Sequence, residues 1–242
     1  MRNKIIFLIL VISFSSQAFA WEKTYTFWFK GAINSISLSY DTQSLEDCNR
    51  SVYQWQKAHG TLSGEKDVNY KRYIAEAPCN NMVEGFVTRL NDLALHDMVT
   101  IENRKDYAEL FLAFVNGIPY AKDIEAWHKD DFIQTPFQTL YFNQGDCEDH
   151  AILLASMYKL LCYDTVFLSF PTHLAVGLSE DALEDVETDE MTYYPNNGKR
   201  YYYCEATRGE FCPTCENFEI GKVPESKKGK SADVESFNCG CN

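Results

Sequence analysis

The sequence predicts an α+β fold in which one buried central helix accompanies a set of strands. At helical spacing, the segment from Cys147 to Leu161 is apolar on both sides, which is typical of a helix buried all round. Three segments after this helix have the β-branched and aromatic composition of strands. They are Thr165–Phe170, His173–Leu178 and Lys199–Thr207.

Strands and helices are also expected before the central helix. The aromatic and β-branched segment Thr24–Ser39 predicts two strands that turn near Gly31. Apolar residues near helical spacing predict a helix over Asn81–Leu95. A second helix is expected over Tyr107–Val115, ending near Gly117.

Three polar segments predict irregular or mobile structure. Ser179–Met191 contains seven acidic residues and no apolar periodicity, so we expect a solvated loop. The residues from Pro195 to Gly198 are typical of a turn. After Pro224 the chain is polar, and we expect a mobile tail apart from what its terminal cysteines hold.

The amino terminus has the pattern of a secretory signal peptide. Arg2 and Lys4 precede the apolar run Ile5–Phe14, and small residues at Ala18 and Ala20 mark a cleavage site. We therefore expect an exported protein, periplasmic or secreted. The apolar run is about half as long as a bilayer-spanning helix needs to be, and no later segment is comparably apolar, so no membrane span is expected.

The formal net charge of −13 argues against a nucleic-acid partner, because phosphates would be repelled. We expect the negative charge mainly to keep the protein soluble.

Nine cysteines in an exported chain indicate an oxidising compartment and disulfide bonds. Because nine is odd, full pairing of eight leaves one free thiol, and Cys147 is the candidate. We expect Cys48 to pair with Cys79. We also expect a disulfide at Cys204, and the carboxy-terminal cysteines would pair among themselves or with Cys162 and Cys204. Disulfides and a four-thiolate zinc site both stay open for the carboxy-terminal group Cys212, Cys215, Cys239 and Cys241.

The motif GDCED places Cys147 at the start of the central helix. Asp146 is a suitable N-cap and Asp149 stands at the third helical position, which predicts a capping box. The helix N-terminus lowers the pKa of a thiol and opposes the effect of the flanking acids. The alternative, that Cys147 is a small buried residue at the start of a core helix, stays open.

A nucleophilic thiol needs a base, and the base needs an orienting group. Among the five histidines, His173 opens a strand on which Ala175 and Gly177 share its side, leaving room for the start of the Cys147 helix. On the following strand, Glu205 shares a face with Tyr203 and is the carboxylate that could reach the histidine.

These residues carry a resemblance. The run PFQTLYFNQGDCEDHAILLASMYKLLCYDTVFLSFPTHLAVGL, followed by NGKRYYYCEAT, resembles the transglutaminase-like superfamily of papain-related cysteine enzymes. FVNGIPYAKD is similar to a segment that precedes the nucleophile in prokaryotic members. The resemblance implies a papain-like core, with the nucleophile helix packed on an antiparallel sheet.

The same resemblance implies the site and the organisation of the chain. Cys147 would be the nucleophile, His173 the general base and Glu205 the third member, where many relatives have aspartate. No metal ligand or cofactor is required, although relatives that bind calcium near the nucleophile make Asp146 and Glu148 calcium candidates. The expected parts are a signal peptide (1–20), an amino-terminal strand and helix layer (21–100), a catalytic core (101–225) and a polar cysteine-containing tail (226–242).

We therefore expect an amide or peptide hydrolase that acts on a protein or peptide through a thioester acyl-enzyme. The Cys147 backbone N–H would supply part of an oxyanion hole, with a side chain from Gln138, Tyr141 or Gln144. Two alternatives stay open. One is a transglutaminase that cross-links proteins, and the other is a catalytically silent binding module on the same fold.

Overall fold

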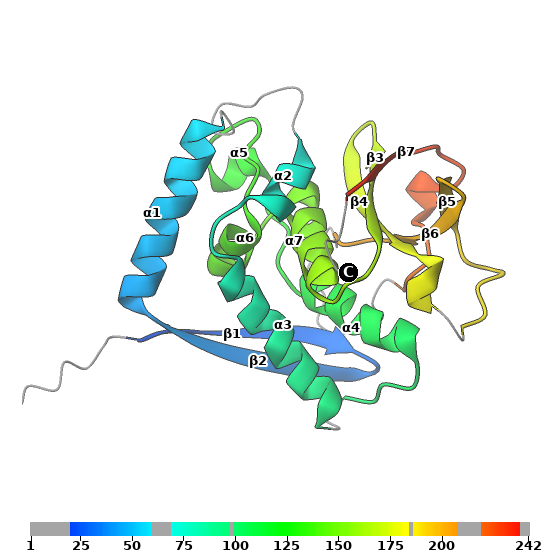
Figure 1. Ribbon diagram of the computed structural model, residues 1–242, viewed down its shortest axis with the longest axis horizontal. Helices are drawn as coiled ribbons and strands as arrows, with labels where there is room; N and C mark the ends of the chain where they lie inside the picture. Colours follow the sequence, from blue (N-terminus) through cyan, green and yellow to red (C-terminus); the bar gives the residue numbers. More distant parts are fainter. Residues whose placement is uncertain (1–19, 60–68, 97–98, 184–185, 208–218, 238–242) are drawn as a thin grey trace, which may run out of the picture.

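The computed structural model describes residues 20–59, 69–96, 99–183, 186–207 and 219–237, and these form an α+β fold (Figure 1). The α-helices are α1 (Thr42–Ala58), α2 (Tyr70–Ala75), α3 (Asn80–Leu95), α4 (Arg104–Asn116), α5 (Asp123–Ala126), α6 (Pro136–Phe142) and α7 (Cys147–Leu160), and the 3₁₀ helices are η1 (Glu180–Leu183) and η2 (Glu225–Lys227). The strands are β1 (Ala20–Phe29), β2 (Ala32–Asp41), β3 (Thr165–Phe170), β4 (His173–Ser179), β5 (Tyr193–Asn196), β6 (Lys199–Cys204) and β7 (Asp233–Ser236).

The main sheet has the order β5-β6-β4-β3-β7, and every neighbouring pair is antiparallel. In Figure 1 it lies on one side of the molecule, with the helices beside it. The expected strands β3 and β4 are confirmed. The third expected strand ends at Cys204, so Glu205 lies just beyond the end of β6.

The central helix α7 is confirmed, and its residues from Asp149 to Tyr158 are all buried. It packs on the face of β4 that carries Leu174, Val176 and Leu178, which share its hydrophobic core. The expectation that α7 would lie against the His173 and Ala175 side of β4 is therefore wrong. Ala175 instead packs in a second cluster with tyrosines of β5 and β6, because both faces of this sheet are covered.

The amino-terminal hairpin β1-β2 turns at Lys30 and Gly31, as expected near Gly31, and both residues have positive φ. Side chains of β1 pack with α4 and α3 in the same core that surrounds α7. A disulfide joins Cys48 of α1 to Cys79 at the start of α3, which confirms the expected pair.

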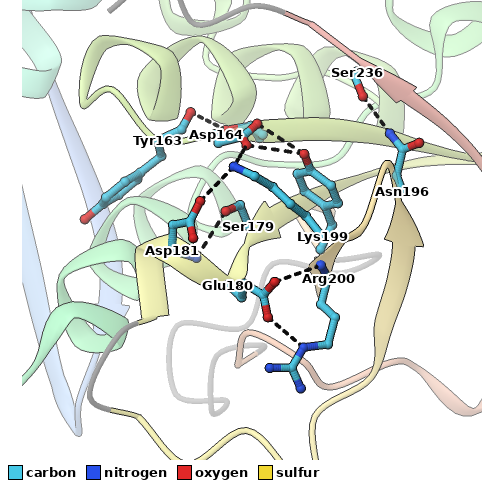
Figure 2. A network of polar contacts seen from close by, with 11 residues as sticks. Tyr163, Asp164, Ser179, Glu180, Asp181, Asn196, Lys199, Arg200 and Ser236 are labelled. Atoms are coloured by element: carbon cyan, nitrogen blue, oxygen red, sulfur yellow. Dashed lines mark hydrogen bonds and ion pairs between the residues drawn. The ribbon is translucent and has the colours of Figure 1, made fainter. Parts of the chain in front are cut away.

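The segment expected as a solvated loop after Ser179 is partly ordered against the sheet. Ala182 and Leu183 in η1 are buried, which corrects that expectation. The neighbouring acids pair with the cations of β6: Lys199 bridges Asp164 and Asp181, and Arg200 binds Glu180 (Figure 2). Two acids at the start of this segment, Glu180 and Asp181, thus form ion pairs that fasten η1 to the sheet.

The polar tail is also ordered over part of its length, contrary to the expected mobility. Asp233–Ser236 forms the edge strand β7 on β3. Glu235 of this strand forms an ion pair with Lys71 of α2, and Phe237 packs on Phe167. These contacts bring the tail against the same sheet that carries His173.

The cysteine expectations are met in part. Cys147 is a free thiol, but Cys204 is also free, so the expected disulfide at Cys204 is wrong. Its side chain is buried in the core against Tyr158 of α7, where it acts as a small apolar residue. Cys162 is disulfide-bonded.

Several expectations fall outside the described residues. They are the signal peptide over residues 1–19 and the disulfide or zinc alternatives at Cys212, Cys215, Cys239 and Cys241. Within the described ranges, no helix is both long and apolar enough to cross a bilayer.

Candidate active site

Cys147 is the first residue of α7, and the expected capping box is present. Asp146 accepts from the Asp149 backbone, and the Asp149 side chain accepts from the Asp146 backbone N–H. Asp149 also accepts two hydrogen bonds from Gln134, which fixes the helix start to the preceding loop. A Cβ at Gly145 would lie 2.7 Å from the Asp149 Cβ, so this close approach requires the glycine of GDCED.

His173 and Glu205 are hydrogen-bonded, with Nε2 of the imidazole 2.9 Å from Oε1 of the carboxylate. His173 is the first residue of β4, and Glu205 follows the end of the adjacent strand β6. The antiparallel pairing of the two strands brings these ends together. The expected base and orienting acid are thus in contact, and Nδ1 of the imidazole is left facing away from Glu205.

Burial alone would raise the pKa of Glu205, but its partners outweigh this effect. The hydrogen bond and charge of His173, the phenol of Tyr203 and the ammonium of Lys227 together hold the pKa of Glu205 below its ordinary value. Glu205 is therefore a buried anion at neutral pH.

Cys147 and His173 line one cavity of about 300 Å³. Tyr70, Glu148 and the β3-β4 turn complete its wall. Within the part of the chain described, the thiol donates to Oε2 of Glu148 at 2.9 Å and makes no hydrogen bond to His173. The geometry therefore places the nucleophile candidate beside the base without a direct bond between them.

The pKa of Cys147 is raised, because the thiol is buried and because Glu148 lies beside it as a charge and a hydrogen-bond acceptor. The backbone of Leu174 offsets this only in part. The helix N-terminus was expected to oppose the flanking acids, but in this arrangement burial and Glu148 raise the pKa of the thiol. The raised pKa favours the neutral thiol form of Cys147.

Carboxylates converge beside the thiol. Ligand atoms of Asp146, Cys147 and Glu148 all lie within 4.8 Å of one another. Asp123 and Asp131 interact electrostatically with Glu148, and each has a buried carboxylate oxygen without a hydrogen-bond partner. Unpartnered carboxylate oxygens suit a hard cation such as calcium, whereas the thiol does not. The expected calcium candidates Asp146 and Glu148, with Asp123 and Asp131 near Glu148, are therefore chemically suited to calcium.

The side chains expected to complete an oxyanion hole differ in their surroundings. Gln138 is committed to Thr135 and Gln56 through hydrogen bonds of both amide atoms, so it is not available. Tyr141 stacks on Trp21 and Phe137. Gln144 is half-buried.

The remaining histidines are separate from this cavity. His96 and His128 are exposed, and His59 contacts the Trp55 carbonyl. His150 is fully buried, and burial lowers its pKa to about 4. It is therefore a neutral core residue.

Three residues near the site were missed in the sequence. Tyr70 lines the cavity, and burial and neighbouring acids raise the pKa of its phenol, so it is a hydrogen-bond donor. Tyr203 and Lys227 contact Glu205. Tyr203 stands two residues before Glu205 on the same face, and this spacing could have predicted their contact. No sequence pattern pointed to Tyr70 or Lys227.

A larger cavity of about 750 Å³ lies at the other end of α7, between Tyr107, Leu161, Asp164 and Asp181. The 14 residues of α7 separate it from Cys147 by about 20 Å at the helical rise. It belongs to a different region of the surface.

No protein-family model matches the chain, and no curated protein matches it.

Proposed function

We propose that the chain is an exported cysteine hydrolase of the transglutaminase-like type that cleaves amide bonds in a protein or peptide substrate, with its helix and sheet forming a papain-like core. The supporting observation is the 2.9 Å contact of Glu205 with His173, which lines the same cavity as Cys147. The disulfide between Cys48 and Cys79 supports an oxidising compartment.

In the proposed reaction, the Cys147 sulfur attacks the amide carbonyl while His173 takes the thiol proton. The thiol first leaves its hydrogen bond to Glu148. His173 then returns the proton to the leaving amine, and a thioester remains on Cys147. Water, deprotonated by His173, hydrolyses the thioester and releases the acid. Glu205 orients the imidazole and stabilises its protonated form.

The oxyanion formed during attack needs donors. As the first residue of α7, Cys147 has a backbone N–H with no acceptor inside the helix. The second donor would come from a side chain on the cavity wall.

A bound calcium ion would supply positive charge beside the thiol. Asp146 and Glu148, with Asp123 and Asp131, would hold it. The chain's own residues carry every proton transfer described above.

The test compares two cysteine variants on a mixture of unfolded protein substrates. We expect Cys147→Ala to lose amide hydrolysis. The matched control Cys204→Ala removes the other described free thiol and should retain hydrolysis at a temperature where it is folded. Full hydrolysis by Cys147→Ala would refute the proposal.

A second function is favoured by the acids at the site. Glu148 lines the cavity with Cys147 and would attract a substrate amine. A lysine amine that attacks the thioester in place of water would make the protein a transglutaminase. Incorporation of a labelled amine into a glutamine-containing protein, without cleavage, would support this alternative.

The neutral Cys147 thiol, bonded to Glu148, favours a third function, a silent binding module. Failure of Cys147 to react with iodoacetamide at every pH from 6 to 9 would support it.

A further inference from the structure

Glu205 is held by more donors than an orienting acid requires. Besides His173, the Tyr203 phenol donates to Oε2 at 2.6 Å and the Lys227 ammonium lies 3.1 Å from the same oxygen. The backbone N–H of Thr207 donates to Oε1 at 3.3 Å. Only 3% of the Glu205 side chain is exposed, so these groups replace its water.

We propose that Lys227 is a positioning residue for the reaction, because it keeps Glu205 ionised and turned toward His173. This inference rests on the proposed function, in which Glu205 orients the base. Lys227 is not among the residues that line the cavity, and its ion pair is with Glu205, so it acts through Glu205.

The charges around Glu205 support this role. Tyr203 from β6 and the Thr207 backbone are neutral donors, and His173 from β4 is the base that exchanges its proton in the reaction. His150 of α7 also faces Glu205 and is neutral. Among the described residues that contact the carboxylate, Lys227 is thus the permanent cation, and its side chain is 19% exposed. An ion pair this far from water is screened less than a surface pair.

The position of Lys227 in the chain gives the tail a role. Lys227 ends η2, and the strand β7 that follows pairs with β3. Before η2, Glu219 binds Lys105 of α4. The described tail is therefore fastened on both sides of Lys227, which holds its ammonium against the buried carboxylate of Glu205.

The experiment compares Lys227→Met with Lys228→Met. Lys228 is the adjacent residue, and its exposed ammonium pairs with Glu225 instead. The measurement uses the Cys147→Ala background, where no reaction is expected. The NMR signal of the Glu205 side-chain carboxyl carbon is followed against pH, and it is assigned because this signal is missing from the spectrum of Glu205→Gln. We expect the titration midpoint of Glu205 to move up by about one pH unit in Lys227→Met. It should stay in place in Lys228→Met and be restored in Lys227→Arg.

A second readout uses the active protein. On the acid side of the profile of kcat/KM against pH, the half-maximal point should move up by about one pH unit in Lys227→Met and not in Lys228→Met. A merely structural role would lower activity equally at every pH. Equal Glu205 midpoints in the two methionine variants would overturn the proposal, whether or not the protein hydrolyses amides. Absence of hydrolysis with a shifted midpoint would instead overturn the proposed function alone.

Discussion

Nε2 of His173 lies 2.9 Å from Oε1 of Glu205, although 32 positions separate the two residues in the chain. The pairing of β4 with β6 creates this contact, and the burial of Glu205 excludes water from it. A histidine held by a buried anion in this way has one ring nitrogen committed, so its other nitrogen is oriented for proton transfer.

Glu205→Gln should slow hydrolysis by roughly 10²- to 10⁴-fold, the range that general base catalysis contributes. The amide keeps the shape of the side chain but removes the charge that stabilises protonated His173. The measurement is kcat on the substrate that wild-type protein cleaves. The control Glu225→Gln changes an exposed acid and should leave kcat unchanged. Unaltered kcat in Glu205→Gln would show that His173 works without the acid.

Glu148→Gln should speed the alkylation of Cys147 by iodoacetamide at pH 7 to 8. After burial, Glu148 is the main cause of the raised pKa of Cys147, so its neutralisation favours the thiolate. The rate is read by mass spectrometry of the Cys147 peptide in the folded protein. Glu125→Gln, an exposed acid of α5, is the control, and Cys204 should remain unlabelled until the protein unfolds. A rate equal to wild type in Glu148→Gln would contradict the assigned cause.

Removing the Cys48–Cys79 disulfide should lower the free energy of unfolding by about 4 kcal/mol, as its chain separation of 31 residues implies. The double variant Cys48→Ala/Cys79→Ala would be compared with wild type by urea denaturation. Because the bond joins α1 to the start of α3, activity at low temperature should persist. An unchanged unfolding midpoint would show that packing alone holds these helices.

Calcium should raise the thermal midpoint of wild type more than that of Glu148→Gln. The charge of Glu148 acts unfavourably on Asp123, Asp131 and Asp146, and a divalent cation would relieve that repulsion. EDTA should reverse the shift. Glu125→Gln should respond as wild type does. Equal shifts in Glu148→Gln and wild type would place any calcium binding elsewhere.

In EDTA, Asp123→Asn should stabilise the protein at pH 7.5 but not at pH 4. Burial, with smaller effects of Glu148 and Asp131, raises the pKa of Asp123 to about 6. Because the folded-state pKa lies above the unfolded value, the stabilising contribution of this group is complete below about pH 4 and is lost as pH rises through 6. Asparagine still accepts from the Phe132 backbone but has no charge to bury. The exposed control Asp130→Asn should show no such pH dependence of the thermal midpoint.

Local signals in the sequence predicted the start of the site well. Asp146 and Asp149 form a capping box because capping depends on residues three positions apart, and the sequence displays that spacing. The contact between His173 and Glu205 was also predictable, since both residues stand on neighbouring strands near their ends. Helix α1 was missed, although the spacing of Leu45, Cys48 and Val52 on its buried face was available as a signal.

Other features depend on tertiary contacts that no local pattern shows. The face of β4 that meets α7 could not be predicted from the sequence. Leu174 and Ala175 lie on opposite faces and are both buried, so the two faces do not differ in polarity. Lys227 reaches Glu205 from a position 22 residues further along the chain. The thiol's raised pKa depends on burial and on the position of Glu148, neither of which the motif GDCED reveals.

The proposal that Cys147 is the nucleophile is tested most directly by trapping the acyl-enzyme. Wild-type protein is mixed with a cleavable peptide or amide substrate, quenched in acid at short times and analysed by mass spectrometry of the intact protein and its peptides. We predict a substrate acyl group on Cys147 that forms and decays with turnover. This acyl group should be absent in Cys147→Ser and should form more slowly in Glu205→Gln. Hydrolysis that proceeds at the wild-type rate in Cys147→Ser, or an acyl group found on another residue, would contradict the proposal.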